Sequence, residues 1–117
     1  MLYEAKASHI GSNLSCIDIL TVLYTGILNV DGELKEDRDR MIYSKGWAAA
    51  TAYFFLAEKG ILPKEALATY NKPGSPLIGL VESGVRGIEA STGSMGHGLP
   101  IGIGMALGAK RGGQKWR

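Results

Sequence analysis

The chain has 117 residues, of which 45% are hydrophobic and 21% charged, and its formal net charge is +2. This balance is typical of one small globular domain and argues against a disordered chain. The charge is too small to indicate a nucleic acid or a membrane surface as a partner. No secretion signal opens the sequence, so we expect a cytoplasmic protein.

The first quarter of the chain predicts two helical pieces separated by a turn. Residues 2–7 have the character of a helix end, and residues 8–13 contain turn formers that would break it. Ser15 then precedes an aspartate three positions on, which is a helix start signal. Apolar residues follow at helical spacing and predict a helix over residues 16–29; they are Ile17, Leu20, Tyr24, Ile27 and Leu28. Cys16, the only cysteine, is interpreted as a small core residue.

The middle of the chain predicts one strand followed by helices. Residues 41–44 read Met-Ile-Tyr-Ser, a short apolar run that predicts a buried β-strand. The alanine- and aromatic-rich residues 47–59 predict a helix that a following glycine ends. Pro63 suits the first turn of another helix over residues 64–70.

The last third of the chain predicts a loop and then a helix. Residues 71–88 have the composition of a loop, and a helix is predicted over residues 98–110, with Pro100 in its first turn. Strand and helices together indicate an α/β fold, but one strand cannot form a sheet. We therefore interpret residues 1–117 as a mostly helical piece of a larger α/β domain, with a small all-helical domain as the alternative.

Glycine is unusually frequent, with 17 in the chain against a usual share of roughly 7%. Eight of them lie between Gly79 and Gly104, among Ile, Leu and Met, which indicates close backbone approach to a helix or a ligand. The dinucleotide fingerprint, the phosphate-binding loop and the nucleophile elbow are all absent when checked letter by letter. With only His9 and His97, a metal site built from histidines is not expected.

Three segments, taken in order, resemble the amino-terminal part of transketolases. Residues 7–12 read Ala-Ser-His-Ile-Gly-Ser, and residues 38–46 read Arg-Asp-Arg-Met-Ile-Tyr-Ser-Lys-Gly. Residues 87–99 read Gly-Ile-Glu-Ala-Ser-Thr-Gly-Ser-Met-Gly-His-Gly-Leu, and their histidine is similar to that of the shorter, two-gene transketolases. The resemblance covers nearly the whole chain. It implies an incomplete thiamine-diphosphate-binding fold, the diphosphate-binding domain, over residues 1–117.

The resemblance also implies roles for five residues. His9 would face the reacting carbons and the thiazolium of the cofactor, and His97 would approach its aminopyrimidine or the substrate, so both are candidate catalytic residues. Gly93, Ser94 and Met95 would hold the rings of thiamine diphosphate, with glycine needed because a side chain would push a ring away. For His9 the alternative is a histidine at a helix end that bonds to the backbone.

Two positions depart from the family pattern. Trp47 stands where transketolases have a histidine near the diphosphate, and Leu80 stands where they have a second active-site histidine. The indole of Trp47 donates one hydrogen bond but carries no positive charge, and Leu80 does neither. Lys45 is a candidate substitute cation, and a solvated surface lysine is the alternative interpretation.

The metal and the full reaction are expected to need more than these residues. The Gly-Asp-Gly segment that binds Mg²⁺ or Ca²⁺ in the family does not occur here, so the metal ligands are expected outside this chain. The glutamate that activates the cofactor is also expected from another domain. The chain alone is therefore expected to be inactive.

The resemblance implies a subunit or fragment that transfers a two-carbon ketol unit between sugar phosphates, in a homo-oligomer, with a second chain, or both. Three alternatives remain open at this point. The chain could be a component of a 2-oxoacid dehydrogenase or of a deoxyxylulose phosphate synthase. It could be a non-catalytic, truncated paralogue that acts as an assembly partner. It could also be an unrelated small helical binding module.

Overall fold

The computed structural model describes residues 1–117 and consists of helices and loops, with no β-strand. Four α-helices carry most of the regular structure, and three short turns of π- or 3₁₀-helix, labelled η, accompany them. In chain order the elements are α1 (Ile10–Leu14), α2 (Ile17–Val22), the π-helical η1 (Leu23–Ile27), the 3₁₀-helical η2 (Gly46–Ala48), α3 (Ala49–Glu58), the 3₁₀-helical η3 (Lys64–Thr69) and α4 (Gly98–Arg111). None of the helices combines the length and hydrophobicity that a bilayer crossing requires.

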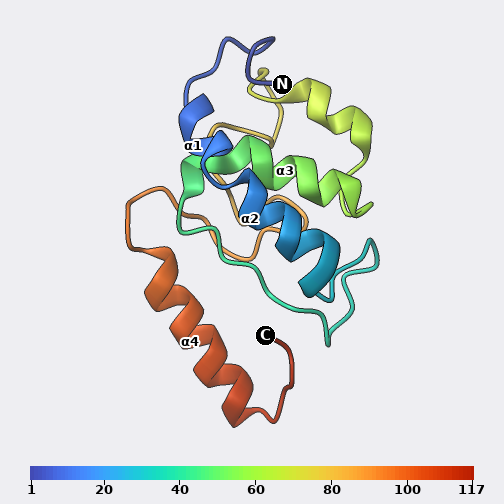
Figure 1. Ribbon diagram of the computed structural model, residues 1–117, viewed down its shortest axis with the longest axis vertical. Helices are drawn as coiled ribbons and strands as arrows, with labels where there is room; N and C mark the ends of the chain where they lie inside the picture. The colour runs from blue at the N-terminus through green and yellow to red at the C-terminus, as the bar shows by residue number, and fades with distance from the viewer.

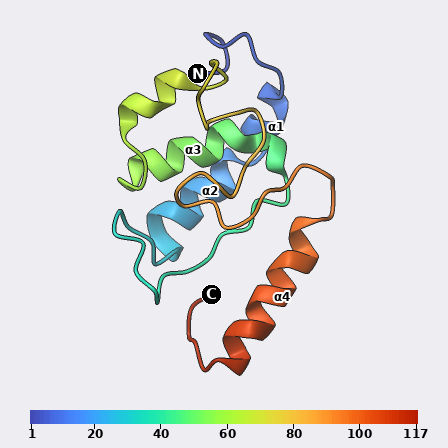
Figure 2. The ribbon, with the colours of Figure 1, turned by 180° about the vertical axis from the view of Figure 1, so that it is seen from behind.

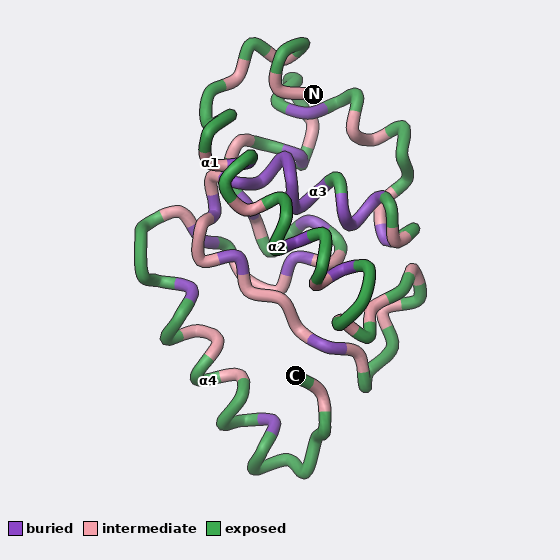
Figure 3. The backbone as a smooth tube through the Cα atoms, in the orientation of Figure 1, coloured by how far each residue is buried: buried purple, intermediate pink, exposed green.

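Helix α3 lies at the centre of the core. Eight of its ten residues are buried (Figure 3), and Tyr53 and Leu56 are among the most deeply buried side chains of the molecule. Its alanines leave room for close neighbours, so α1 and α2 pack on this helix. The rings of Tyr24 and Phe55 stack with their centroids 5.3 Å apart and join α3 to η1. The prediction of a helix over residues 47–59 is confirmed by η2 and α3 together.

The predictions for the amino-terminal residues are confirmed in part. The helix predicted over residues 16–29 is present as α2 followed by η1. The helix end predicted at residues 2–7 is wrong, because these residues form turns, and the break predicted at residues 8–13 is wrong beyond His9, where α1 begins. Asn13 explains the difference: its buried side chain bonds to both α1 and α3, and such tertiary contacts outweigh the weak helix propensity of Gly-Ser-Asn.

The predicted β-strand over residues 41–44 is not formed in this chain. These residues have no regular secondary structure, because a strand is defined by a ladder of hydrogen bonds and the only backbone bond here joins Arg40 N to Arg117 O. Tyr43 is nevertheless buried in the core, as a buried strand would predict. The α/β prediction is therefore not confirmed for residues 1–117, whereas the mostly helical character is.

Helix α4 stands apart from the body formed by α1, α2 and α3 (Figures 1 and 2). It confirms the helix predicted over residues 98–110, with Pro100 in the first turn, and η3 confirms the helical segment predicted after Pro63 in 3₁₀ form. Only two of its fourteen residues, Gly98 and Ala109, are buried. The chain then turns back toward the body, where Arg40 lies over the ring of Trp116 at 5.0 Å.

Candidate cofactor-binding site

Three loops that carry the family-like motifs meet at the start of α4. Val81 N donates to Gly46 O at 3.1 Å, and Thr92 N donates to Val81 O at 3.3 Å. The hydroxyl of the buried Thr92 donates to Tyr43 O. These bonds fix residues 43–46, 81 and 92 relative to one another and so set the position from which the loop of residues 93–97 leaves.

Two glycines at this junction are required by packing. A Cβ at Gly46 would collide with the carbonyl oxygen of Thr92, and a Cβ at Gly98 would lie 2.5 Å from Ser44 Cα. Gly98 N also donates to Ser44 Oγ at 3.2 Å, which anchors the first residue of α4. The interpretation of the glycines as sites of close backbone approach is confirmed here, with protein rather than ligand as the neighbour.

The loop of Gly93, Ser94 and Met95 is open to solvent on one side. Gly93 is half-buried beside Leu80, whose methyl carbons would lie 3.5 Å from a Cβ at position 93. Ser94 is exposed, and the Met95 side chain is 80% exposed although it is apolar. An exposed thioether next to a glycine offers a surface for an aromatic ring, so these residues fit the rings of thiamine diphosphate.

The two histidines lie at the starts of two helices. His97 is the cap residue of α4, is exposed, and bonds through its backbone N–H to Ser94 O at 3.3 Å. His9 caps α1 with a left-handed backbone (φ 73°), and its ring Nδ1 lies 3.4 Å from Ser8 Oγ. The starts of α1 and α4 lie on the same side of the molecule in both views (Figures 1 and 2). No hydrogen bond joins either ring to the other or to residues 93–95.

Asn13 positions the backbone of His9, a role that the sequence motifs did not indicate. Its side chain is buried, at 4% exposed, and Nδ2 donates to His9 O at 2.9 Å. Its Oδ1 accepts hydrogen bonds from the backbone N and the hydroxyl of Thr51, both at 2.8 Å. A buried asparagine with all these partners is a rigid support for the turn at His9. The only signal in the sequence was a polar residue in a segment interpreted as a helix break.

The residues that depart from the family pattern are held by the same framework. Leu80 O accepts from Tyr53 Oη at 2.9 Å, and its side chain is partly exposed beside Gly93. Trp47 is half-buried in η2. Lys45 Nζ donates to Ser15 Oγ at 2.5 Å, so its ammonium group is tied to the turn before α2. The wall beside Gly93 is therefore apolar.

Charged and phenolic groups near the junction serve packing. Glu89 pairs with Arg38 at 2.6 Å and lies 3.9 Å from Arg40 Nε, which ties the segment before residue 41 to the loop before residue 91. Tyr24 and Tyr43 share a hydrogen bond of 2.5 Å between their hydroxyls in the core. Burial raises the pKa of both phenols, so the pair stays neutral near pH 7 and does not act as an acid or a base.

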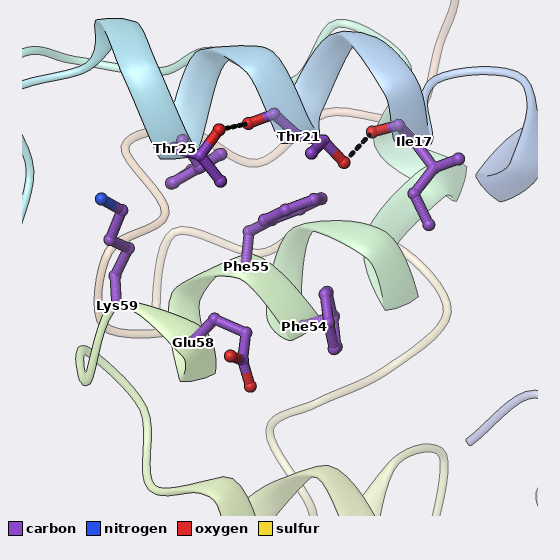
Figure 4. A pocket seen from close by; sticks show the side chains of 8 residues that line it. Ile17, Thr21, Thr25, Phe54, Phe55, Glu58 and Lys59 are labelled. Carbon is purple, nitrogen blue, oxygen red and sulfur yellow. Dashed lines mark hydrogen bonds between the residues drawn. The ribbon is translucent and has the colours of Figure 1, made fainter.

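A groove of about 380 Å³ between α2 and α3 does not belong to this junction (Figure 4). Its walls are mainly apolar and include Ile17, Phe54 and Phe55. The hydroxyls of Thr21 and Thr25 donate to the carbonyls of Ile17 and Thr21 at 2.8 and 2.7 Å, so their protons are already engaged. None of its lining residues comes from the three loops, and we do not assign the cofactor to it.

The structure gathers no metal-binding group, because no three His, Cys, Asp or Glu side chains lie close enough together to hold an ion. The family model described as "Transketolase, thiamine diphosphate binding domain" matches residues 1–116. The chain belongs to this transketolase family. The resemblance seen in the sequence is therefore confirmed, and the alternative of an unrelated helical module is wrong.

Several curated transketolase subunits are similar to this chain. It is 44% identical to one lettered subunit of the apulose-4-phosphate transketolase of Phocaeicola vulgatus, over 94% of this chain and 40% of that protein. The corresponding protein from Actinobacillus succinogenes is 43% identical, over 92% and 40%. The 6-deoxy-6-sulfo-D-fructose transketolase subunit SqwG of a Clostridium species is 37% identical, over 85% and 37%. The chain thus spans about 40% of the length of these relatives.

Proposed function

We propose that the chain is the cofactor-binding part of one subunit of a two-chain transketolase in the cytoplasm. The enzyme would transfer a two-carbon ketol unit between sugar phosphates. The observation that carries this proposal is the 44% identity, over 94% of the chain, to a subunit of the Phocaeicola vulgatus transketolase. The name of that relative designates one subunit of several, which supports a second chain as partner. That chain would complete the active site, and the enzyme is expected to form an oligomer.

The cofactor would be held at the loop of Gly93, Ser94 and Met95. Thiamine diphosphate supplies the carbanion chemistry by which the carbon–carbon bond is broken and formed. The exposed Met95 side chain would pack on one of its rings, and the half-buried Gly93 would let the ring approach the backbone. The Mg²⁺ or Ca²⁺ ion that accompanies the diphosphate would take its ligands from outside residues 1–117.

The two histidines would act on protons and charge near the reacting carbons. His9 would stabilise the oxygen on which negative charge develops or would transfer a proton to it, and His97 would approach the aminopyrimidine or the substrate. Both side chains are exposed at helix starts on one side of the molecule, which leaves them accessible to a ligand. Asn13 would act on His9 as a positioning residue, through its bond to His9 O.

A non-catalytic assembly partner is the second candidate, and two residues favour it. Leu80 makes the wall beside Gly93 apolar, and Trp47 stands at the other position where a charged or proton-transferring group was expected. Lys45, the candidate substitute cation, is already bonded to Ser15 Oγ. A chain of this kind would bind its partner normally while contributing nothing to turnover.

The experiment that separates these candidates measures ketol transfer by the full-length protein purified with its second chain. We expect His9→Ala to lower kcat by about 10²-fold or more, because a general acid–base or charge-stabilising group contributes that much. Lys72→Ala, at an exposed lysine outside the three loops, is the matched control and should leave kcat unchanged. Turnover by His9→Ala at the wild-type rate would remove His9 from the reaction, and absence of turnover in the wild-type complex would favour the assembly partner.

Residues 1–117 alone are predicted to bind thiamine diphosphate weakly and to have no ketol-transfer activity. The reason is that the metal ligands and the activating glutamate are expected elsewhere in the enzyme. Titration calorimetry with thiamine diphosphate and Mg²⁺ checks this prediction. Micromolar binding by the 117-residue chain would show that the loop of residues 93–95 and its neighbours suffice, and would contradict it.

A further inference from the structure

Residues 40–44 have the side-chain pattern of a β-strand although they lack a ladder. Tyr43 lies in the core and Met41 packs against it. Ile42 and Ser44, which alternate with them, line a groove of about 390 Å³ beside α4. Side chains that alternate between two faces are the pattern of a strand, with the core on one face and α4 on the other.

One edge of this segment is unpaired. In a strand the N–H and C=O of one residue point to one edge and those of the next residue to the other. Arg40 N donates to Arg117 O at 2.7 Å, and Tyr43 O accepts from Thr92 on the opposite edge. The peptide groups of Ile42 and Ser44 therefore point to the Arg117 side, and no backbone hydrogen bond satisfies them.

The end of the chain is already placed at this edge. Arg117 N donates to Asp39 Oδ1 at 2.7 Å, and Arg117 O accepts from Arg40, so the last residue makes the first rung of a ladder. The residues after α4 run back in the same direction as residues 40–44 in both views (Figures 1 and 2), toward the groove beside α4. The relatives are longer than the region shared with this chain.

We propose that the residues following Arg117 in the full-length protein form a β-strand that pairs in parallel with residues 40–44 and fills the groove beside α4. In a parallel ladder, the residue two positions after Arg117 bonds to Arg40 O and Ile42 N, and the pairing continues to Ser44. The groove is lined mainly by aliphatic side chains and glycines, so the strand is apolar where it faces α4. It covers both α4 and the unpaired edge, neither of which residues 1–117 cover.

Amide hydrogen exchange tests this pairing without any measurement of activity, so its outcome is separate from that of the proposed function. The Ile42 and Ser44 amides should exchange at least about 100-fold more slowly in the full-length protein than in the 117-residue chain, because a ladder bond must open first. The Leu56 amide in α3 is the control and should be protected in both. Fast exchange of Ile42 and Ser44 in the full-length protein would overturn the proposal.

A second copy of the chain is the competing occupant of the edge. In that case Ile42 and Ser44 would be protected in the 117-residue chain as well, and their protection would rise with protein concentration. Such a result would also overturn the proposal. The expected result is that both amides stay unprotected in the 117-residue chain at every concentration at which Leu56 is protected.

Discussion

Helices α3 and α4 have similar sequences in one respect, since both are built from alanine or glycine with large apolar residues, but they lie in different surroundings. Eight of the ten residues of α3 are buried, against two of the fourteen residues of α4. The α4 side chains of Leu99, Ile103 and Leu107 are 68%, 53% and 57% exposed and share one face, because they are spaced four residues apart. An apolar face of this kind indicates a surface that contacts other polypeptide.

The difference shows which part of the molecule is complete in itself. Around α3, the side chains of α2, η1 and the loop of residues 77–88 close a core. Around α4, contact is limited to its first residues and to the turn that follows it. Stability is therefore expected to depend strongly on residues near α3 and weakly on residues of α4.

The largest difference is predicted for leucine truncation. Leu56→Ala should lower the free energy of unfolding by about 2–5 kcal/mol, because Leu56 is fully buried and a cavity would remain. Leu107→Ala in α4 should change it by less than about 0.5 kcal/mol, since that side chain already contacts solvent. Urea unfolding of both variants checks this. Equal losses would contradict the view that α4 lies outside the core.

Glycine substitution should separate the two regions in sign. Gly46→Ala should destabilise by about 1–3 kcal/mol, because its Cβ would collide with the carbonyl oxygen of Thr92 and the junction of loops would have to shift. Gly104→Ala in α4 meets no atom within 4 Å and should stabilise the helix by about 0.5–1 kcal/mol. Thermal unfolding of the two variants measures both effects. A neutral Gly46→Ala would show that the junction is loose.

A smaller effect is predicted where the two regions join. Burial alone would raise the pKa of Asp39, but hydrogen bonds from the Asn29 and Arg117 N–H groups and the charge of Arg117 outweigh it, and the pKa is lowered. The carboxylate thus stabilises the fold above its unfolded pKa of about 3.9, and this contribution is lost as the pH falls through the lower folded value.

Asp39→Asn should therefore cost about 1–2 kcal/mol at pH 7, because a hydrogen bond to a charged group is replaced by a weaker one. At pH 3 the difference between wild type and variant should be smaller. Urea unfolding at both pH values measures it. A difference that is the same at pH 3 and pH 7 would show that the charge of Asp39 has no part in holding the end of the chain.

Helices were predictable from the sequence because their signals are local. The apolar spacing after Cys16, the alanine-rich segment before Gly60 and the proline in the first turn of α4 each predict an element that is present. Residues 41–44 were predicted as a strand from the same kind of signal. A ladder also needs a neighbour, and a property of two segments cannot be seen in one.

The candidate site was predictable only through its resemblance to transketolases. The motifs indicated Gly93, Ser94, Met95 and the two histidines, whose roles stay predictions. The contacts that shape the junction, such as Thr92 with Tyr43, join residues distant in the sequence. Neither spacing nor composition indicates such contacts, because burial and packing are set by the whole fold.

The measurement that tests the contrast between α3 and α4 most directly is light scattering of the 117-residue chain at micromolar concentration. The exposed face of Leu99, Ile103 and Leu107 is predicted to recruit a partner, so the chain should be a dimer or larger. Replacement of two of these residues, Ile103→Glu with Leu107→Glu, should shift it toward the monomer. A wild-type monomer of 12.5 kDa with cooperative unfolding would show that these helices close their own core and would contradict the prediction.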